Sequence, residues 1–148
     1  SMSKQLSQKT ITTWARLLKS HRYLLEQVES DLKAADLPRL SWYDLLYELE
    51  CCKKEGLRQY EIAALILLSK HNLSRLLDRL EQKNLIRRLP CPEDGRGNCI
   101  LITKAGTQTL KNMWPVYAQA IQKYFSDHLS PQELQNLSDI LDKLMDVI

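Results

Sequence analysis

The chain has 148 residues, of which 44% are hydrophobic and 26% charged, with four glycines and five prolines. This length suits one compact domain with its own core, and the composition excludes disordered and collagen-like proteins. The longest apolar run, residues 62–68, is far shorter than the roughly 20 residues that cross a bilayer, and residues 1–8 lack the apolar core of a signal peptide. Four cysteines are a thin disulfide framework for this length, so we expect a cytoplasmic protein without a membrane partner.

The net charge of +3 is unevenly distributed along the chain. Residues 69–104 contain eight bases and four acids, a balance of +4, whereas the remainder of the chain sums to −1. All of the excess positive charge therefore lies in the middle third, where an anionic partner is expected.

The first part of the chain is predicted to be helical. Residues 10–35 contain neither glycine nor proline and repeat apolar residues at spacings of three and four, which is typical of an amphipathic helix. We expect this helix to end before Pro38, because the residue preceding a proline is pushed out of the α region. Ser41 is the expected N-cap of a second helix that continues to about Lys54, with Gly56 as its stop.

A short helix and a basic helix are expected next. The short one covers residues 59–68, and Ser69 is the expected N-cap of the basic one, residues 70–83. The apolar period then changes, and residues 85–89 and 99–102 read as two short strands. The prolines and glycines of residues 90–98 predict the tip of a hairpin between them.

Two further helices are predicted after the hairpin. Thr103 is the expected cap of a long helix that reaches about Phe125, and Pro115 is expected to kink or divide it. The last helix is marked by Ser130 as cap, a proline at the first helical position and Glu133 as the partner of a capping box. The order is helix–turn–helix followed by a hairpin, which is typical of a winged helix-turn-helix DNA-binding module.

The basic helix, residues 70–83, has a surface suited to the major groove. Four leucines share one face, and the opposite face presents polar and basic residues. Arginine pairs with guanine, asparagine with adenine, and hydroxyls and helix N-termini with phosphate. An ordinary amphipathic helix with a solvated charged face shows the same pattern, but the hairpin directly downstream favours DNA binding. The expected DNA contacts in this helix and its cap are Ser69, His71, Asn72, Ser74, Arg75 and Arg79.

The hairpin tip supplies one further expected contact. Arg96 lies between Gly95 and Gly97, on a thin loop that can reach into an adjacent minor groove, where arginine responds to groove width and negative potential. Asp94 is expected to support the wing by orienting Arg96 or the turn backbone rather than to contact DNA.

In this order the motifs resemble the MarR-type (multiple antibiotic resistance regulator) winged helix-turn-helix transcription factors. Residues 69–81 resemble the recognition helix of that family, and residues 84–88 its strand entry, with Asn84 where glycine is usual. The wing pattern of the family appears as Asp94-Gly95-Arg96 followed after five residues by Ile102-Thr103, although many members carry a second arginine where this chain has glycine. Leu40-Ser41-Trp42-Tyr43-Asp44-Leu45 also resembles the start of the second helix of the family.

The resemblance implies a fold and an assembly. The fold is mainly α with a small β-hairpin wing, in a single domain over residues 1–148: a winged helix-turn-helix over about 41–103 and dimerisation helices over about 10–35 and 104–148. A homodimer is implied, and the apolar stripes of the terminal helices support one, although such stripes also form intrachain cores. A two-fold dimer presents its recognition helices about 34–36 Å apart, which suits a pseudo-palindromic site in double-stranded DNA.

The resemblance also implies regulation by a small effector. Members of the family commonly bind an effector between the dimerisation helices and the winged module, and the expected lining here is His21, Trp42, Tyr43 and Tyr47. These residues suit an aromatic or amphipathic molecule, and the alternative is that they only pack. The expected mechanism is a population shift to a helix spacing that no longer matches the two half-sites.

A transcriptional regulator would act as a repressor or an activator, and the alternatives to it are an enzyme, a redox-responsive regulator and a module that binds protein or RNA. The three histidines belong to no recognisable catalytic triad, zinc-protease motif, phosphate loop or dinucleotide fingerprint, so we expect neither an enzyme nor a cofactor. Cys91 and Cys99 flank the wing and could form a redox-controlled disulfide, or remain unpaired small hydrophobes; the cysteine spacing gives no zinc site. A winged-helix module that binds protein or RNA is the remaining alternative.

Overall fold

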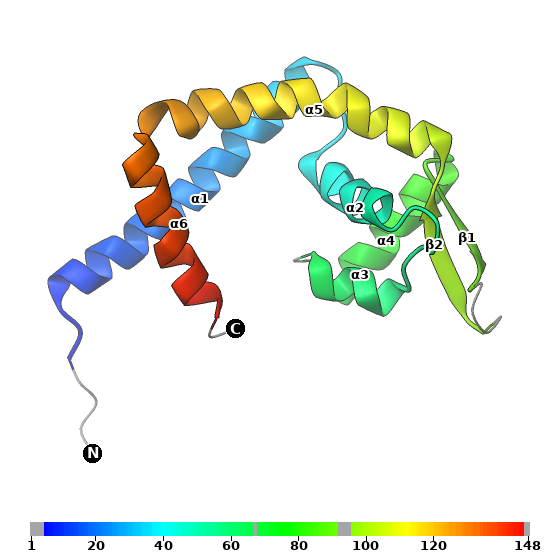
Figure 1. Cartoon of the computed structure of the whole chain (residues 1–148), viewed down its shortest axis with the longest axis horizontal. Coiled ribbons are helices and arrows are strands. Elements are labelled where there is room, and N and C mark those ends of the chain that lie inside the picture. The colour runs from blue at the N-terminus through cyan, green and yellow to red at the C-terminus, as the bar shows by residue number, and fades with distance from the viewer. Residues whose placement is uncertain (1–4, 67, 92–95, 147–148) are drawn as a thin grey trace. The chain divides into compact units, whose positions relative to one another are not determined.

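The chain folds into six α-helices, one short 3-10 helix and a β-hairpin in the part that the structure describes (Figure 1). The computed structural model describes residues 5–66, 68–91 and 96–146. The expected fold class is confirmed: mainly helical, with one two-stranded antiparallel sheet. The elements are α1 (Gln8–Ala34), α2 (Leu40–Cys51), α3 (Gln59–Leu65), α4 (Lys70–Gln82), β1 (Ile86–Pro90), β2 (Asn98–Ile102), α5 (Lys104–Tyr124), η1 (Ser126–His128) and α6 (Pro131–Met145).

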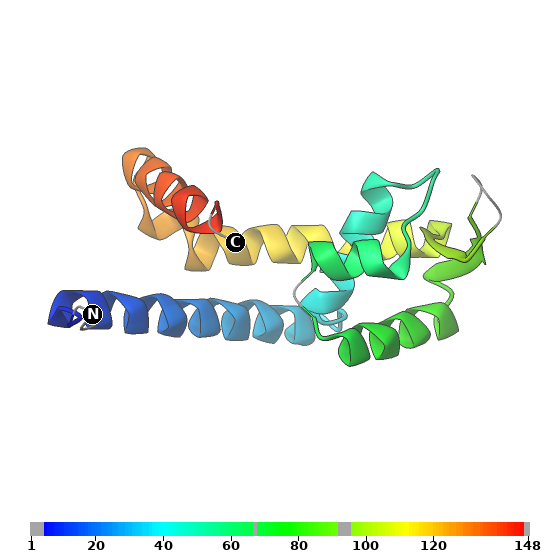
Figure 2. The ribbon, with the colours of Figure 1, turned by 90° about the horizontal axis from the view of Figure 1, so that it is seen from below.

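The chain divides into two compact units. The central unit is Leu32–Val116, and the terminal unit combines Ser1–Asp31 with Tyr117–Ile148. Helices α2, α3 and α4 and the hairpin lie wholly in the central unit (Figures 1 and 2). The terminal unit contains α6 together with the larger part of α1 and the last residues of α5.

Helix α1 ends through a left-handed residue. Asp36 has a φ of 57°, and its N–H donates to the carbonyl of Lys33 over 3.1 Å. The N–H of Leu37 donates to the carbonyl of Leu32 over 2.9 Å, so the last turn closes as a Schellman motif. The helix ends before Pro38, as expected. Its end is set by the left-handed residue Asp36, two positions before the proline.

The prediction that Ser41 caps the second helix is wrong. Arg39 is the N-cap, with an extended backbone (ψ 156°), and Trp42 N–H already donates to the Arg39 carbonyl over 3.0 Å. Leu40 is buried as the first residue of the helix, because this position removes its side chain from water. Ser41 consequently lies inside the helix. The helix also ends at Cys51, earlier than the predicted Lys54.

Helices α3 and α4 form the helix-turn-helix. Glu61 accepts a hydrogen bond from the Arg58 N–H over 3.0 Å at the start of α3, and the helix ends at Leu65, three residues before the predicted end. The predicted cap of α4 is confirmed, because the Ser69 hydroxyl accepts from the Asn72 N–H over 3.2 Å.

The hairpin is in register from Ile86 opposite Ile102 to Pro90 opposite Asn98. Leu57, just before α3, forms a bridge with Ile100 through hydrogen bonds of 3.0 and 2.8 Å. The segment that precedes α3 therefore extends the wing sheet along the outer edge of β2.

The core of the central unit is aliphatic. It joins α2, α3, α4 and both strands to the first turns of α5. The residues in it that are fully shielded from solvent are Leu45, Leu46, Leu49, Ile62, Leu73, Leu77 and Leu80. Each such leucine or isoleucine stabilises the fold by about 1.5–3 kcal/mol relative to an exposed position.

Thr103 connects the end of the wing to α5. Its hydroxyl donates to the carbonyl of Asn84 over 2.7 Å and accepts from the Gly106 N–H over 3.0 Å, which confirms it as the cap of α5. A side chain at Gly106 would collide with the carbonyl of Leu85, so glycine lets this first turn approach the strand entry.

The terminal unit contains the predicted last helix. Ser130 and Glu133 form the capping box of α6, with Pro131 at its first position, as predicted. Tyr124 donates from its hydroxyl to Asp31 over 3.0 Å, which joins α5 to α1. Pro115 does not divide α5, since the helix is continuous from Lys104 to Tyr124.

Candidate nucleic-acid interface

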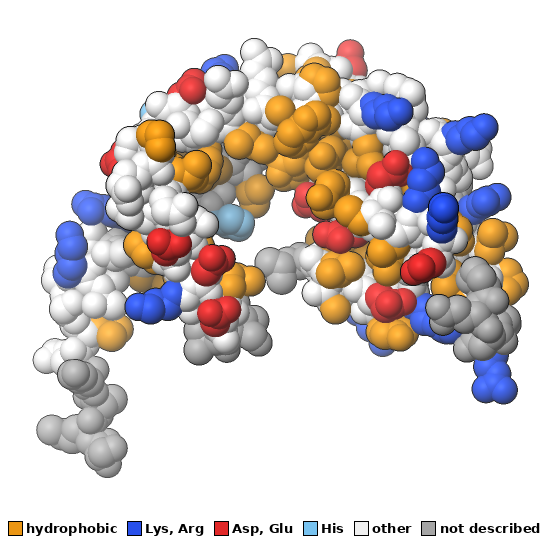
Figure 3. Space-filling model, in the orientation of Figure 1, with side chains coloured by type: hydrophobic (Ala, Val, Ile, Leu, Met, Phe, Trp, Pro, Cys, Tyr) orange, Lys and Arg blue, Asp and Glu red, His pale blue; other side chains and the backbone are white. Residues whose placement is uncertain are grey.

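Helix α4 separates an apolar face from a polar one, as its sequence predicts. Leu73, Leu76, Leu77 and Leu80 are buried. On the other side His71, Asn72, Arg75 and Arg79 are exposed, and Ser74 is half-buried. Lys and Arg side chains gather over the hairpin end of the central unit in Figure 3. The polar face of α4 can therefore meet an anionic partner without disturbing the core.

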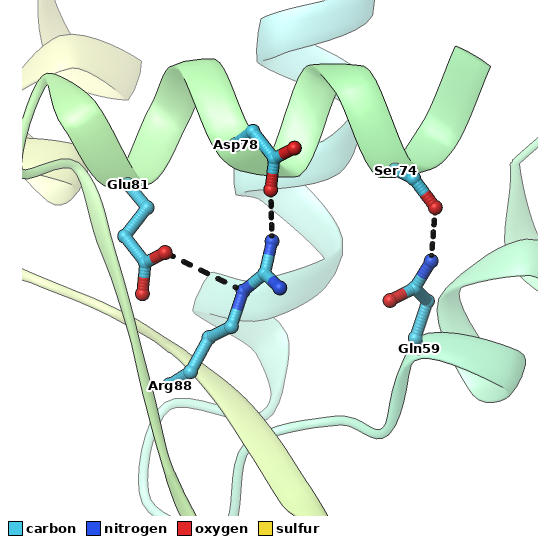
Figure 4. Close-up of polar contacts among 5 residues, drawn as sticks. All are labelled: Gln59, Ser74, Asp78, Glu81 and Arg88. Carbon is cyan, nitrogen blue, oxygen red and sulfur yellow. Dashed lines mark hydrogen bonds and ion pairs between the residues drawn. The ribbon is translucent and has the colours of Figure 1, made fainter. Parts of the chain in front are cut away.

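Ser74 is held by a neighbouring helix. Gln59, the first residue of α3, donates from its side-chain amide to the Ser74 hydroxyl over 2.8 Å (Figure 4). The hydroxyl proton of Ser74 still allows it to donate to a phosphate oxygen. Gln59 was not expected from the sequence, because its partner lies 15 residues away on another helix.

A second polar contact joins α4 to the wing. Arg88 of β1 donates to Asp78 over 2.9 Å, and its Nε lies 3.7 Å from a carboxylate oxygen of Glu81 (Figure 4). The contact with Glu81 is an ion pair, but 3.7 Å is too long for a hydrogen bond. The buried Nε of Arg88 therefore has no hydrogen-bond partner among the described residues. Asp78 and Glu81 are the two acids of residues 69–104 that the structure describes. Within that described part, both form ion pairs with Arg88 and not with the arginines on the exposed face of α4.

The described part of the wing places Arg96 at the surface. Arg96 is exposed and is followed by Gly97, whose φ is +65°. A Cβ atom at residue 97 would lie 2.8 Å from Nη1 of Arg58, so the guanidinium of Arg58 packs over this glycine. Asp94 and Gly95 lie outside the described residues, and the expected support of Arg96 by Asp94 stays a prediction.

The wing is closed by a disulfide. Cys91 and Cys99 are bonded, with their Cα atoms 4.9 Å apart, and both are buried. The alternative that these two are unpaired small hydrophobes is therefore wrong, whereas Cys51 and Cys52 are free. The bond encloses residues 92–98, the loop that contains Arg96.

Asn84 occupies a position that requires an unusual backbone. Its φ is +60°, in the left-handed region that glycine and asparagine tolerate best. The asparagine in place of the usual glycine therefore keeps the turn between α4 and β1.

The aromatic residues expected to line an effector site lie in both units. Tyr43 stacks on Tyr47, with ring centroids 6.2 Å apart, and on Trp114 of α5, at 6.1 Å. Trp42 is half-buried against the core, and His21 is exposed on α1 in the terminal unit. Trp114 is a member of this cluster that the sequence does not predict, because it lies on α5, far from Tyr43 in the chain.

The phenols of this cluster differ in their surroundings. Burial, then Tyr47 and Asp44, raises the pKa of Tyr43. The neighbouring Cys51 thiol raises the pKa of Tyr47. Both phenols therefore remain protonated at neutral pH and can donate a hydrogen bond to a ligand.

Comparison with known proteins relates the central part of the chain to one family. Residues 35–97, which run from the end of α1 into the wing, match the sequence model of the MarR family. Over this central segment the chain is similar to MarR-type regulators. This family consists of transcription regulators rather than enzymes.

Solved structures agree over the whole MarR-type fold. AbsC, a MarR family transcriptional regulator from Streptomyces coelicolor, is 29% identical, with a TM-score of 0.84 and 97% of each chain covered. Sco3205 from the same organism, solved in complex with DNA, is 23% identical, with a TM-score of 0.88, 99% of this chain and 91% of that chain covered. A mutant MarR from E. coli complexed with operator DNA is 20% identical, with a TM-score of 0.79, 95% of this chain and 99% of that chain covered.

One curated relative carries a functional name. The HTH-type transcriptional repressor IacR of Pseudomonas putida is 26% identical over 126 residues, which cover 85% of this chain and 73% of the relative. Within the residues that the structure describes, no helix is long and apolar enough to cross a membrane. The same residues contain no group of three or more His, Cys, Asp or Glu that could hold a metal ion.

Proposed function

We propose that this protein is a MarR-type regulator that binds double-stranded DNA in a sequence-specific manner, with α4 in the major groove and the wing in the minor groove. The proposal rests on the exposed polar face of α4. The two acids of this helix, Asp78 and Glu81, form ion pairs with Arg88 of β1. The proposed contacts from α4 and its cap are Ser69, His71, Asn72, Ser74, Arg75 and Arg79, and the wing contributes Arg96. IacR, named a transcriptional repressor, supports repression as the outcome.

Salt dependence tests this proposal. Sites are first selected from random duplex DNA, and the affinity for the best site is then measured over a salt series. Each neutralised phosphate contributes about −0.9 to the log–log slope, so a dimer should give a slope steeper than about −3. A shallower slope, or equal affinity for selected and scrambled duplexes, would instead support a winged-helix module that binds protein or RNA.

We also propose that the functional unit is a homodimer, with a second copy covering the exposed apolar residues of α1 and α6. On α1 these are Ile11, Trp14, Leu17, Leu18 and Leu25, and on α6 they are Leu134, Ile140, Leu141, Leu144 and Met145. Trp14 is 61% and Met145 63% exposed in the single chain, which is costly for such large side chains if they stay in water.

Oligomeric state in solution tests the dimer. Light scattering of the parent should give twice the chain mass, and the double change Leu141→Glu with Leu144→Glu should give the chain mass. Asn136→Glu is the matched control, since it adds charge to α6 at a position that is already polar and accepts a hydrogen bond from Gln132. A monomeric parent at micromolar concentration would contradict the proposal.

The effector of this proposal is an aromatic or amphipathic molecule that contacts Trp42, Tyr43 and Tyr47 of the central unit. The stacked rings of Tyr43, Tyr47 and Trp114 support it, since a planar ligand can extend such a stack at Tyr47, which is half exposed. Salicylate and other small phenols are suitable probes: binding should quench tryptophan fluorescence, and Tyr47→Ala should weaken it. A probe that binds parent and variant equally would exclude this cluster.

The disulfide favours a second candidate function, redox-responsive regulation. Reduction by a dithiol would give two cysteine thiols and oxidise the dithiol, opening the covalent loop that contains Arg96. DNA affinity should then differ between oxidised and reduced parent, and the variant Cys91→Ser with Cys99→Ser should behave as reduced in both conditions. Equal affinity in both conditions would leave the disulfide a purely structural bond.

A further inference from the structure

Three successive residues before and at the start of α3 contact three different elements. Leu57 forms its two hydrogen bonds with Ile100 of β2. Arg58 packs its guanidinium over Gly97 in the wing, and Gln59 donates to Ser74 of α4. This short segment therefore connects the wing to the proposed recognition helix.

Gly97 is held from two sides. Its carbonyl accepts a hydrogen bond from the Cys91 N–H over 3.3 Å, across the base of the wing. On the other side, the space that a Cβ would take is occupied by Arg58, whose Nη1 would lie 2.8 Å from that atom. The positive φ of Gly97 (+65°) directs the chain through this narrow position. Since Arg96 precedes Gly97 directly, these contacts also fix where its backbone lies.

We propose that Arg58 is a positioning residue of the wing: its guanidinium sets where Arg96 is presented relative to α4, and so determines which bases the wing reads. The inference rests on the proposed DNA binding. A minor-groove arginine responds to local groove width, so a small displacement of the wing changes the preferred sequence at the positions it reaches. The half-buried Arg58 would act through Arg96 and not by its own contact with DNA.

A double-mutant cycle in DNA binding tests this inference. Site selection with Arg96→Ala first identifies the base positions that the wing reads. These are the positions at which the variant shows a weaker base preference than the parent. Arg58→Ala should relax the same positions and weaken binding to the best site by about 3- to 10-fold. Adding Arg58→Ala to Arg96→Ala should then change affinity less than twofold, because the residue through which Arg58 acts is already gone.

Lys111→Ala is the charge-matched control. Lys111 is an exposed cation on α5, and its removal should leave base preference unchanged and combine additively with Arg96→Ala. If Arg58→Ala and Arg96→Ala are instead fully additive, and the salt slope falls by about 0.9 per protomer in Arg58→Ala, Arg58 contacts a phosphate directly and the positioning role is overturned.

Hydrogen exchange provides a readout that does not need DNA. The amides of residues 96–100 should exchange faster in Arg58→Ala than in the parent, while those of α6 exchange at the parental rate. Arg58→Gln serves as a second variant if the alanine variant does not fold. Unchanged exchange at residues 96–100 would overturn the contact itself. If the parent shows no sequence preference for DNA but residues 96–100 exchange faster in Arg58→Ala, the result contradicts the proposed DNA binding and not the contact between Arg58 and the wing.

Discussion

The guanidinium of Arg88 on β1 donates to the carboxylate of Asp78 on α4 over 2.9 Å, and this ion pair joins the wing to the helix beside it. Asp78 is 65% exposed and Arg88 28%, so the pair is partly screened by water. A double-mutant cycle with Asp78→Asn and Arg88→Met should give a coupling of about 0.5–1 kcal/mol in urea unfolding, decreasing at high salt. Strictly additive effects would show that the pair contributes nothing to stability.

Arg75 offers the most direct test of the recognition helix. Arg75→Ala should cost about 1–3 kcal/mol of DNA-binding free energy and relax sequence choice at one position of each half-site. Stability should change little, because Arg75 is exposed on the polar face of α4. Affinity is measured on the selected site and on variants of it. Unchanged affinity for the best site would exclude Arg75 from the interface.

Two serine caps allow stability and binding to be separated. Ser69 caps α4 and Ser130 caps α6 through equivalent hydrogen bonds of 3.2 and 3.1 Å. Each serine-to-alanine change should destabilise the fold by about 1 kcal/mol in thermal or urea unfolding. Only Ser69→Ala should also weaken DNA binding below the unfolding transition, since its hydroxyl lies at the proposed phosphate-binding end of α4. Equal losses of affinity in the two variants would indicate a general effect of stability.

The capping box of α6 should respond to acid. The Ser130 backbone N–H and then its side chain lower the pKa of Glu133 in the folded state. A lowered pKa means that this stabilisation is complete above the usual glutamate value of about 4.3, and is lost as pH falls through the lower folded-state pKa. The parent should therefore be more stable than Glu133→Gln at pH 6, and the difference should shrink below pH 4. A pH-independent difference in urea midpoint would contradict this expectation.

Interactions within one turn could be predicted from the sequence. The caps at Ser69, Thr103 and Ser130 each depend on a residue three positions away, so their spacing alone identifies them. Ser41 has the same local pattern but does not cap its helix, because Leu40 is buried in the first turn and the N-cap is Arg39, two residues upstream. Local chemistry thus competes with core packing, and packing decides here.

Contacts between elements could not be predicted in the same way. The pairs Gln59–Ser74 and Asp78–Arg88 are separated by 15 and 10 residues, and each requires the rotation of two elements about their axes to be known. The cluster of Tyr43 with Trp114 depends likewise on where α5 crosses α2. The polar face of α4 was predictable because helical periodicity alone determines it.

Thr103 has a consequence for the order of folding. Its hydroxyl reaches the carbonyl of Asn84 from 19 residues away in the chain, and that approach requires β1 and β2 to have paired. The same hydroxyl accepts a hydrogen bond from the Gly106 N–H at the start of α5, so the paired hairpin holds the capping oxygen of this helix in place. The contact with Asn84 joins residues 19 positions apart, whereas the contact with Gly106 joins residues three apart. Closing the longer loop costs more chain entropy, so we expect the Asn84 contact to form late in folding, after the hairpin has paired.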